Sequence, residues 1–276
     1  MASLSEITAF LDEKLRIAEI PDYGGAMNGL QLEGGGEVKK VVAAVDASAP
    51  VIEKAVAAGG DLLVVHHGMF WGGAQPLTGA FFRKIKAAMD AGMAIYSAHL
   101  PLDVHPEWGN NACLARAIGL KVGGGFLDYK GIEVGLTCEW SGSRDALVDA
   151  VGQAVGGGVR LCPGGHGEIR PRGLCSGEAV GGGGRLCVCG AGATRGIGPR
   201  SGRDGAQVVE AAAAGIEAFI TGEGPHHTYG LAEELGINLI YAGHYATETF
   251  GVKALAAALG ERFGLASGFV DHPTGL

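Results

Sequence analysis

The chain has 276 residues, 47% of them hydrophobic, and a formal net charge of −8. This length suits one large domain or two small ones with a sizeable core. The acidic balance and the lack of a basic run argue against a nucleic-acid partner. No apolar stretch approaches the roughly 18–20 residues that span a bilayer, so we expect no membrane association. The N-terminus lacks a basic region followed by an apolar one, so we expect no signal peptide and a cytoplasmic protein with reduced thiols.

The first half of the chain alternates between helical and strand patterns. Ser3 and Glu6 fit a capping box, which predicts a helix at the N-terminus. Buried strands are expected at 39–45, 62–65 and 94–98. Helices are expected after Ser48, with Pro50 in the first turn, and over 78–91 and 110–118. Strands that alternate with helices predict an α/β fold with largely parallel strand pairing.

The second half repeats this alternation after three glycines at 123–125. Strands are expected at 134–140, 218–221 and 239–242, and helices after Ser143, over 207–214, over 229–235 and along a long apolar face from Val252 to Phe263. We therefore expect two similar α/β lobes with mixed sheets, at 1–123 and 124–238, and a C-terminal strand-helix-strand segment at 239–276. Residues 164–205 are rich in Gly and Arg and irregular, although 186–189 could form a strand.

Two segments of the sequence resemble each other. They are A94-I-Y-S-A-H-L-P-L-D and L239-I-Y-A-G-H-Y-A-T-E. The first places His99 four residues before Asp103, and the second places His244 four residues before Glu248. Imidazole nitrogens and carboxylate oxygens are common ligands of Zn, Mn, Fe and Co. The repeat therefore predicts that two His/carboxylate pairs contribute to one metal site.

The similarity extends upstream, where D61-L-L-V-V-H-H-G aligns without gaps on E217-A-F-I-T-G-E-G. His67 then matches Glu223, and both follow an apolar strand. Sites in open α/β sheets form beyond the carboxyl ends of the strands, which favours convergence of these polar groups. A chance recurrence of the β-α-β pattern is the alternative.

Each candidate ligand also has a simpler structural interpretation. His66 and His67 would point to opposite faces of a regular strand, so they can serve one site only where the strand ends. Otherwise they are a strand-end pair bonded to the backbone. Pro101 should hold the loop before Asp103 extended, and Asp103 could instead be a helix cap or turn residue.

The pair His244 and Glu248 has helical i, i+4 spacing, which suits a shared metal. A solvated helix start, where Glu is favoured, is the alternative. His226 and His227 form a rival histidine pair on a loop that contains a proline, and either metal binding or substrate contact would fit them.

Several motifs together resemble one known family. They are V64-V-H-H-G-M-F-W, H99-L-P-L-D-V-H-P-E-W-G-N-N, G243-H-Y-A-T-E-T-F-G-V-K-A-L, N28-G-L-Q-L-E-G and D271-H-P-T-G-L. The chain resembles the dinuclear metal-centre family known as GTP cyclohydrolase 1 type 2 homologues, which are NGG-interacting factor-like. The resemblance covers nearly the whole chain except roughly 172–205.

The resemblance implies two α/β lobes with a metal pair in the cleft between them, and a homohexameric ring. It also implies two divalent metal ions per chain, of which Zn, Fe, Mn and Co are the candidates. Carried over residue by residue, it assigns His66 and Asp103 to one metal, His67 and His244 to the other, and Glu248 as the bridge between them.

The expected function is that of a metal-dependent hydrolase that uses a metal-activated water on a small-molecule substrate. Cyclohydrolase-like chemistry and phosphoester or phosphoanhydride hydrolysis are the two options. Glu223, His99 and His226 are the candidates for proton transfer. The alternative is a non-catalytic metal-binding or regulatory protein that acts through partners.

Overall fold

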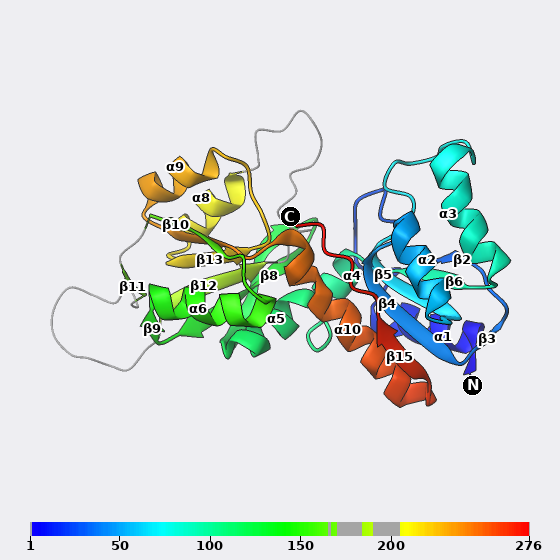
Figure 1. The fold of residues 1–276 in the computed structure, drawn as a ribbon. Helices are drawn as coiled ribbons and strands as arrows, with labels where there is room; N and C mark the ends of the chain where they lie inside the picture. The colour runs from blue at the N-terminus through cyan, green and yellow to red at the C-terminus, as the bar shows by residue number, and fades with distance from the viewer. Residues whose placement is uncertain (1, 165–166, 170–183, 190–204, 276) are drawn as a thin grey trace, which may run out of the picture. The chain divides into compact units, whose positions relative to one another are not determined.

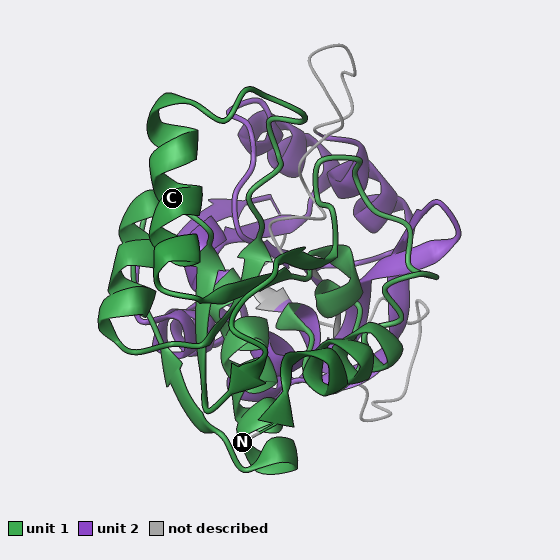
Figure 2. Cartoon of the chain, turned by 90° about the vertical axis from the view of Figure 1, so that its right-hand side faces the viewer, with its two compact units in different colours: residues 1–110, 248–274 green, residues 111–247, 275–276 purple. Residues whose placement is uncertain are grey.

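The computed structural model describes residues 2–164, 167–169, 184–189 and 205–275. These form two compact units, one of residues 1–110 with 248–274 and one of residues 111–247 with 275–276 (Figure 2). Both units combine helices with mixed parallel and antiparallel sheets, which confirms the predicted α/β class. The lobe boundaries expected at 123 and 238 stay a prediction.

The first unit is built on a five-stranded sheet (Figure 1). Its order is β15 (Ala266–Phe269), β4 (Lys40–Asp46), β5 (Leu62–His67), β6 (Ala94–Ser97) and β2 (Gly29–Leu32). The first four strands are parallel to one another, and β2 pairs antiparallel with β6. The inner strands β4, β5 and β6 are almost wholly buried, as continuous apolar runs predict for parallel strands. A short pair, β1 (Ala2–Ser3) with β3 (Glu37–Val38), lies apart from this sheet.

Helices accompany this sheet. They are α1 (Leu4–Lys14), α2 (Ala49–Ala57), α3 (Gly79–Asp90), α4 (Leu100–Asp103) and most of α10 (His244–Phe263). The capping box at α1 is confirmed, because the Glu6 amide donates to Ser3 Oγ and the Ser3 amide donates to Glu6 Oε2. Helix α2 has the expected proline in its first turn, but Ser48 makes no side-chain cap bond there.

The parallel register brings the carboxyl ends of β4, β5 and β6 to one edge of the sheet. Asp46 pairs with His67 across β4 and β5, and the Ala98 amide donates to the Val65 carbonyl. The chain then turns directly into α4, where the amide of Asp103 donates to the carbonyl of His99. The expectation of an extended segment after Pro101 is wrong, because proline is tolerated in the first turn of a helix.

The second unit is built on a six-stranded sheet. Its order is β10 (Arg160–Pro163), β14 (Asn238–Tyr241), β13 (Ala218–Thr221), β12 (Gly184–Cys189), β8 (Ile132–Trp140) and β7 (Lys121–Tyr129). Its helices are α5 (Asn110–Ile118), α6 (Arg144–Val155), α8 (Ala206–Ala213) and α9 (Thr228–Leu235), and β9 (Gly142–Ser143) pairs with β11 (Glu168–Ile169). Strand β12 confirms the option of a strand at 186–189. Most of the irregular segment 164–205 lies outside the described residues.

The internal repeat has a structural counterpart in each unit. Strands β5 and β6 are parallel neighbours, with Leu62 opposite Ala94. Strands β13 and β14 are parallel neighbours in the same way, with Ala218 opposite Asn238. The two segments that resemble each other in sequence therefore form equivalent strand pairs. Within the described residues, no helix has the length and apolar character to cross a membrane.

Candidate metal centre

Two histidines end strand β5, and each is anchored through the same ring atom. His66 Nδ1 donates to the Ala98 carbonyl at 3.0 Å, and His67 Nδ1 donates to Asp46 Oδ1 at 2.9 Å. Because Nδ1 carries the proton in both bonds, the neutral form of each ring has its lone pair on Nε2, where a metal can bind. Metal-binding histidines commonly have this arrangement, in which an oxygen on one side of the ring fixes the nitrogen on the other.

The two Nε2 atoms face carboxylates at distances longer than a hydrogen bond. Glu248 Oε1 lies 3.6 Å from His66 Nε2, and Glu248 Oε2 lies 3.4 Å from His67 Nε2. Asp103 Oδ2 lies 3.7 Å from His66 Nε2. Each oxygen of Glu248 therefore faces a different histidine, which is the arrangement of a carboxylate that can bridge two ions.

The burial of these groups tests whether a cation fits. The side chains of His66, Asp103 and Glu248 are fully buried. His66 Nε2 has no hydrogen-bond partner among the described residues, and a buried polar atom left this way costs free energy. A cation placed among the His66 imidazole and the carboxylates of Asp103 and Glu248 would accept the His66 lone pair and balance the buried negative charge. The donor set therefore fits a divalent transition metal.

The pKa of His66 indicates that its buried carboxylate neighbours stabilise positive charge. Burial alone would lower its pKa, but the carboxylates of Asp103 and Glu248 outweigh burial and raise the pKa to about 10. Without a metal, a proton on His66 thus balances part of the buried negative charge. A metal that binds Nε2 must displace that proton.

Asp103 is held in place by a buried amide that the sequence analysis did not single out. Asn110 Nδ2 donates to Asp103 Oδ1 at 2.9 Å, and Asn110 Oδ1 accepts the Gly251 amide at 2.7 Å. Asn110 thereby connects the end of α4 to the helix that carries Glu248. The motif that ends in two asparagines, at 110 and 111, was the available sequence signal.

His99 lies beside the two strand-end histidines. Its ring centroid is 4.8 Å from that of His66, and ligand nitrogens of His66, His67 and His99 all lie within 4.8 Å of one another. Its Nδ1 donates to Asp22 Oδ1 at 2.9 Å, so its Nε2 also carries the lone pair. Burial lowers the pKa of His99 although the Asp22 bond opposes this, which keeps the ring neutral at pH 7.

Asp22 is a carboxylate that the sequence analysis also missed. It also accepts from Asn28 Nδ2 and from the amide of Leu100. Burial alone would raise its pKa, but the bonds from His99 and Asn28 bring the pKa below its ordinary value. The Asn28 motif was noted as a signature, yet its role, which is to hold Asp22 against His99, requires contacts that a sequence pattern does not show.

One half-exposed aromatic ring borders these histidines. The Trp71 ring meets His99 edge to face at 4.8 Å and His67 at 5.8 Å between centroids. Trp71 is 39% exposed, whereas His99 is 2% exposed. The half-exposed indole therefore packs edge to face against both histidine rings.

The remaining candidate residues lie in the second unit or at its boundary. His244 begins α10, one helical turn before Glu248, and its Nδ1 donates to Glu223 Oε1 at 3.0 Å. Glu223 therefore contacts a candidate ligand instead of standing alone. His226 and His227 are both exposed on the segment before α9, and neither belongs to a group of potential ligands among the described residues.

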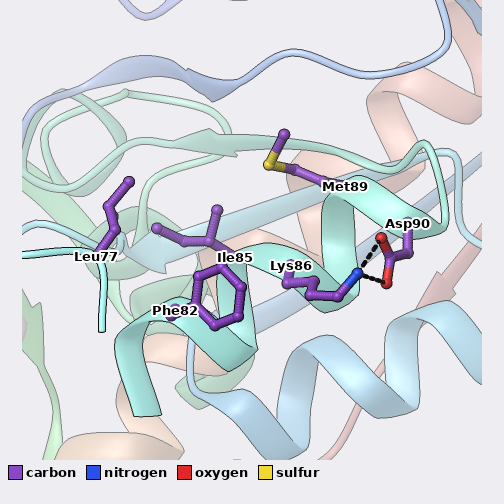
Figure 3. A pocket seen from close by; sticks show the side chains of 6 residues that line it. All are labelled: Leu77, Phe82, Ile85, Lys86, Met89 and Asp90. Carbon is purple, nitrogen blue, oxygen red and sulfur yellow. Dashed lines mark hydrogen bonds and ion pairs between the residues drawn. The ribbon is translucent and has the colours of Figure 1, made fainter. Parts of the chain in front are cut away.

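A separate pocket of about 290 Å³ lies along α3 (Figure 3). It is lined by Leu77, Phe82, Ile85, Lys86, Met89 and Asp90. Its only charged groups pair with each other, Lys86 Nζ lying 2.6 Å from Asp90 Oδ2. No candidate metal ligand lines this pocket, so it is not part of the candidate metal centre.

Comparison with known proteins finds relatives over nearly the whole chain. The family model described as Duf34/NIF3 (NGG1p interacting factor 3) matches residues 2–186 and 197–273. A protein of Deinococcus radiodurans named GTP cyclohydrolase 1 type 2 homolog is 37% identical, with 98% of this chain and 94% of that protein covered. A Pyrococcus abyssi protein of the same name is 38% identical, with 98% of both chains covered.

Two solved structures extend the likeness to the fold. TTHA1606 from Thermus thermophilus is 36% identical with a TM-score of 0.79, and the protein ybgI is 32% identical with a TM-score of 0.83; each comparison covers 100% of both chains. The family expected from the sequence motifs is thus confirmed. The chain belongs to the Duf34/NIF3 (NGG1p interacting factor 3) family.

Proposed function

We propose that this protein binds two divalent metal ions and uses them to hydrolyse a small-molecule substrate. The observation that carries the proposal is the position of Glu248, whose two oxygens face the Nε2 atoms of two different histidines. In this assignment His66 and Asp103 hold one ion, His67 and His244 hold the other, and Glu248 bridges. Bound divalent ions would supply Lewis-acid chemistry that activates water and polarises an electrophile.

The protein residues orient this site and control its protons. Asn110 aims the Asp103 carboxylate, and Glu223 fixes the proton of His244 on Nδ1. His99 presents a neutral Nε2 beside the ligands, so it can accept a proton there, with its Nδ1 proton held by Asp22. Glu223 and His226 are the further candidates for proton transfer. Trp71 packs edge to face against the His99 ring.

The names of the relatives favour one of the two reaction types. Proteins that are 37–38% identical carry the name GTP cyclohydrolase 1 type 2 homolog. We propose ring-opening hydrolysis of a heterocycle as the first reaction to test, followed by phosphoester and phosphoanhydride hydrolysis. We also propose that the chain assembles as a homohexamer, as the family resemblance implies.

A second candidate function is metal binding without catalysis. The complete burial of His66, Asp103 and Glu248 favours it, because buried ligands hold an ion tightly and expose little of it. The two functions differ in turnover. A metal-loaded protein that hydrolyses neither GTP nor simple phosphoesters with any of the candidate metals would support the non-catalytic function.

The test of the metal site is elemental analysis of gently purified protein and of three variants. Wild type should carry about two transition-metal ions per chain. Glu248→Gln keeps the shape but removes the shared negative charge, so it should lose one or both ions while the fold survives. His244→Ala should mainly weaken the ion that it shares with His67.

The matched control is Glu261→Gln, the same substitution at an exposed position of the same helix. It should retain the metal content of the wild type. If Glu248→Gln keeps two ions and His244→Ala loses both, the bridging assignment is wrong. Wild-type protein that neither carries nor takes up metal would overturn the proposed function itself.

A further inference from the structure

The two histidines at the end of β5 are anchored by chemically different groups. His66 Nδ1 donates to a neutral backbone carbonyl, that of Ala98. His67 Nδ1 donates to a carboxylate, that of Asp46. Each Nε2 atom faces one oxygen of Glu248, and His66 Nε2 also faces Asp103 Oδ2. On the side away from the proposed metals, only His67 has a carboxylate partner.

The position of Asp46 is set by the sheet and not by a flexible loop. Asp46 is the last residue of β4 and stands opposite His67 in the parallel register of β4 and β5. The amide of Ala47 donates to the carbonyl of His67 at 2.9 Å, so the backbone beside the pair is fixed as well. Substitution of Asp46 should therefore change the bond to His67 with little change in the strands.

The two histidines also differ in exposure. The side chain of His67 is 18% exposed and that of Asp46 is 31% exposed, whereas that of His66 is fully buried. An ion bound at His67 is thus nearer to solvent than one bound at His66. A carboxylate that accepts the Nδ1 proton makes an imidazole a stronger donor through Nε2, and loss of such a partner typically weakens metal binding by about 10–100-fold.

We propose that Asp46 is a positioning residue that acts through His67, and that it selectively strengthens the metal position at His67, the more exposed of the two strand-end histidines. This inference rests on the proposed two-metal function. Asp46 orients the His67 ring so that Nε2 faces Glu248, and it places a negative charge next to Nδ1. The Ala98 carbonyl orients the His66 ring in the same way but carries no charge. Loss of Asp46 should therefore affect one of the two ions and spare the other.

The experiment titrates metal-free protein with Co²⁺ and follows its visible absorption. Wild type should bind two equivalents in two resolvable steps. Asp46→Asn keeps an oxygen that accepts the Nδ1 proton but removes the charge, and Asp46→Ala removes both. Each should weaken one equivalent by about 10–100-fold and leave the other within about threefold of wild type. The larger loss is expected for Asp46→Ala.

The matched control lies at the opposite end of the same two strands. Asp61 Oδ2 accepts the backbone amides of Lys39 and Lys40, so Asp61 supports β4 and β5 without contact to a candidate ligand. Asp61→Asn should lower the denaturation midpoint and leave both Co²⁺ affinities unchanged. Equal weakening of both equivalents in the Asp46 variants and in Asp61→Asn would show a merely structural role and overturn the inference.

Proton NMR of the Co²⁺ protein supplies a readout that general loosening of the fold would not reproduce. The exchangeable Nδ1 proton of each coordinated histidine gives its own shifted signal. In Asp46→Ala one of these signals should exchange with solvent faster while the others persist. If wild type takes up two Co²⁺ ions and Asp46 variants match it in affinity and exchange, the inference fails; if wild type takes up none, the proposed function fails first.

Discussion

Asn110 offers a direct test of how the candidate metal centre is held together, through the substitution Asn110→Ala. Asn110 is 1% exposed and makes two buried hydrogen bonds, one to the carboxylate of Asp103 and one from the amide of Gly251. A bond to a charged group is worth about 1.5–3 kcal/mol and a neutral one about 0.5–1.5 kcal/mol. The variant should therefore lower the free energy of unfolding by about 2–4.5 kcal/mol.

Urea unfolding of metal-free protein measures this loss. The control is Lys86→Ala, which breaks an exposed i, i+4 ion pair with Asp90 and should cost no more than about 0.5 kcal/mol. Asn110→Asp adds a further check, because it places a second carboxylate 2.9 Å from Asp103 Oδ1. Its deficit relative to wild type should shrink on acidification as either carboxylate is protonated. A loss under about 1 kcal/mol for Asn110→Ala would refute the view that this amide holds Asp103.

Three further predictions concern charge, packing and assembly. Against the effect of burial, the carboxylates of Asp103 and Glu248 raise the pKa of His66 in metal-free protein from 6.5 to about 10. The protonated His66 therefore contributes its full stabilisation below pH 6.5, and this contribution is lost as the pH rises through 10. A free energy of unfolding in urea that does not decline between pH 6.5 and 10 would contradict this prediction. Gly251→Ala should lower the free energy of unfolding, because the new Cβ would lie 2.7 Å from Asn110 Oδ1. Gly152→Ala in α6 should instead raise the free energy of unfolding by up to about 1 kcal/mol, because the nearest atom to its new Cβ is 3.7 Å away. Light scattering should find an assembly larger than a dimer, and a stable 28.0 kDa monomer at micromolar concentration would rule this out.

The sequence predicted most of the elements because their signals are local. The capping box at Ser3, the strand 218–221 and the helix expected over 78–91 rest on residues a few positions apart, and the structure has all three. The fold class followed from the alternation of such elements. The segment after Pro101 was misjudged, since proline is compatible both with an extended loop and with the first turn of a helix.

The site was predictable only in part for a related reason. His66 and His67 end strand β5, and Asp103 ends the short helix that follows β6; all three lie at or shortly after strand ends, where the strand-end rule looks. Asp46 also ends a strand and could have been found by the same rule, but Asp22 and Asn110 act across 77 and 141 residues of chain respectively. Such partners are set by tertiary contacts, which spacing along one sequence does not encode.

The path of the chain through the first unit has a consequence for its biosynthesis. The chain leaves this unit after residue 110 and re-enters it at 248, bringing Glu248 and the edge strand β15 with it. A nascent chain that has emerged only as far as the end of β6 has both β5 histidines but lacks Glu248 and β15, the edge strand that pairs with the outer side of β4. The proposed metal site is therefore complete only late in synthesis, and ribosome-stalled chains that end before residue 248 should bind metal far more weakly than the released protein.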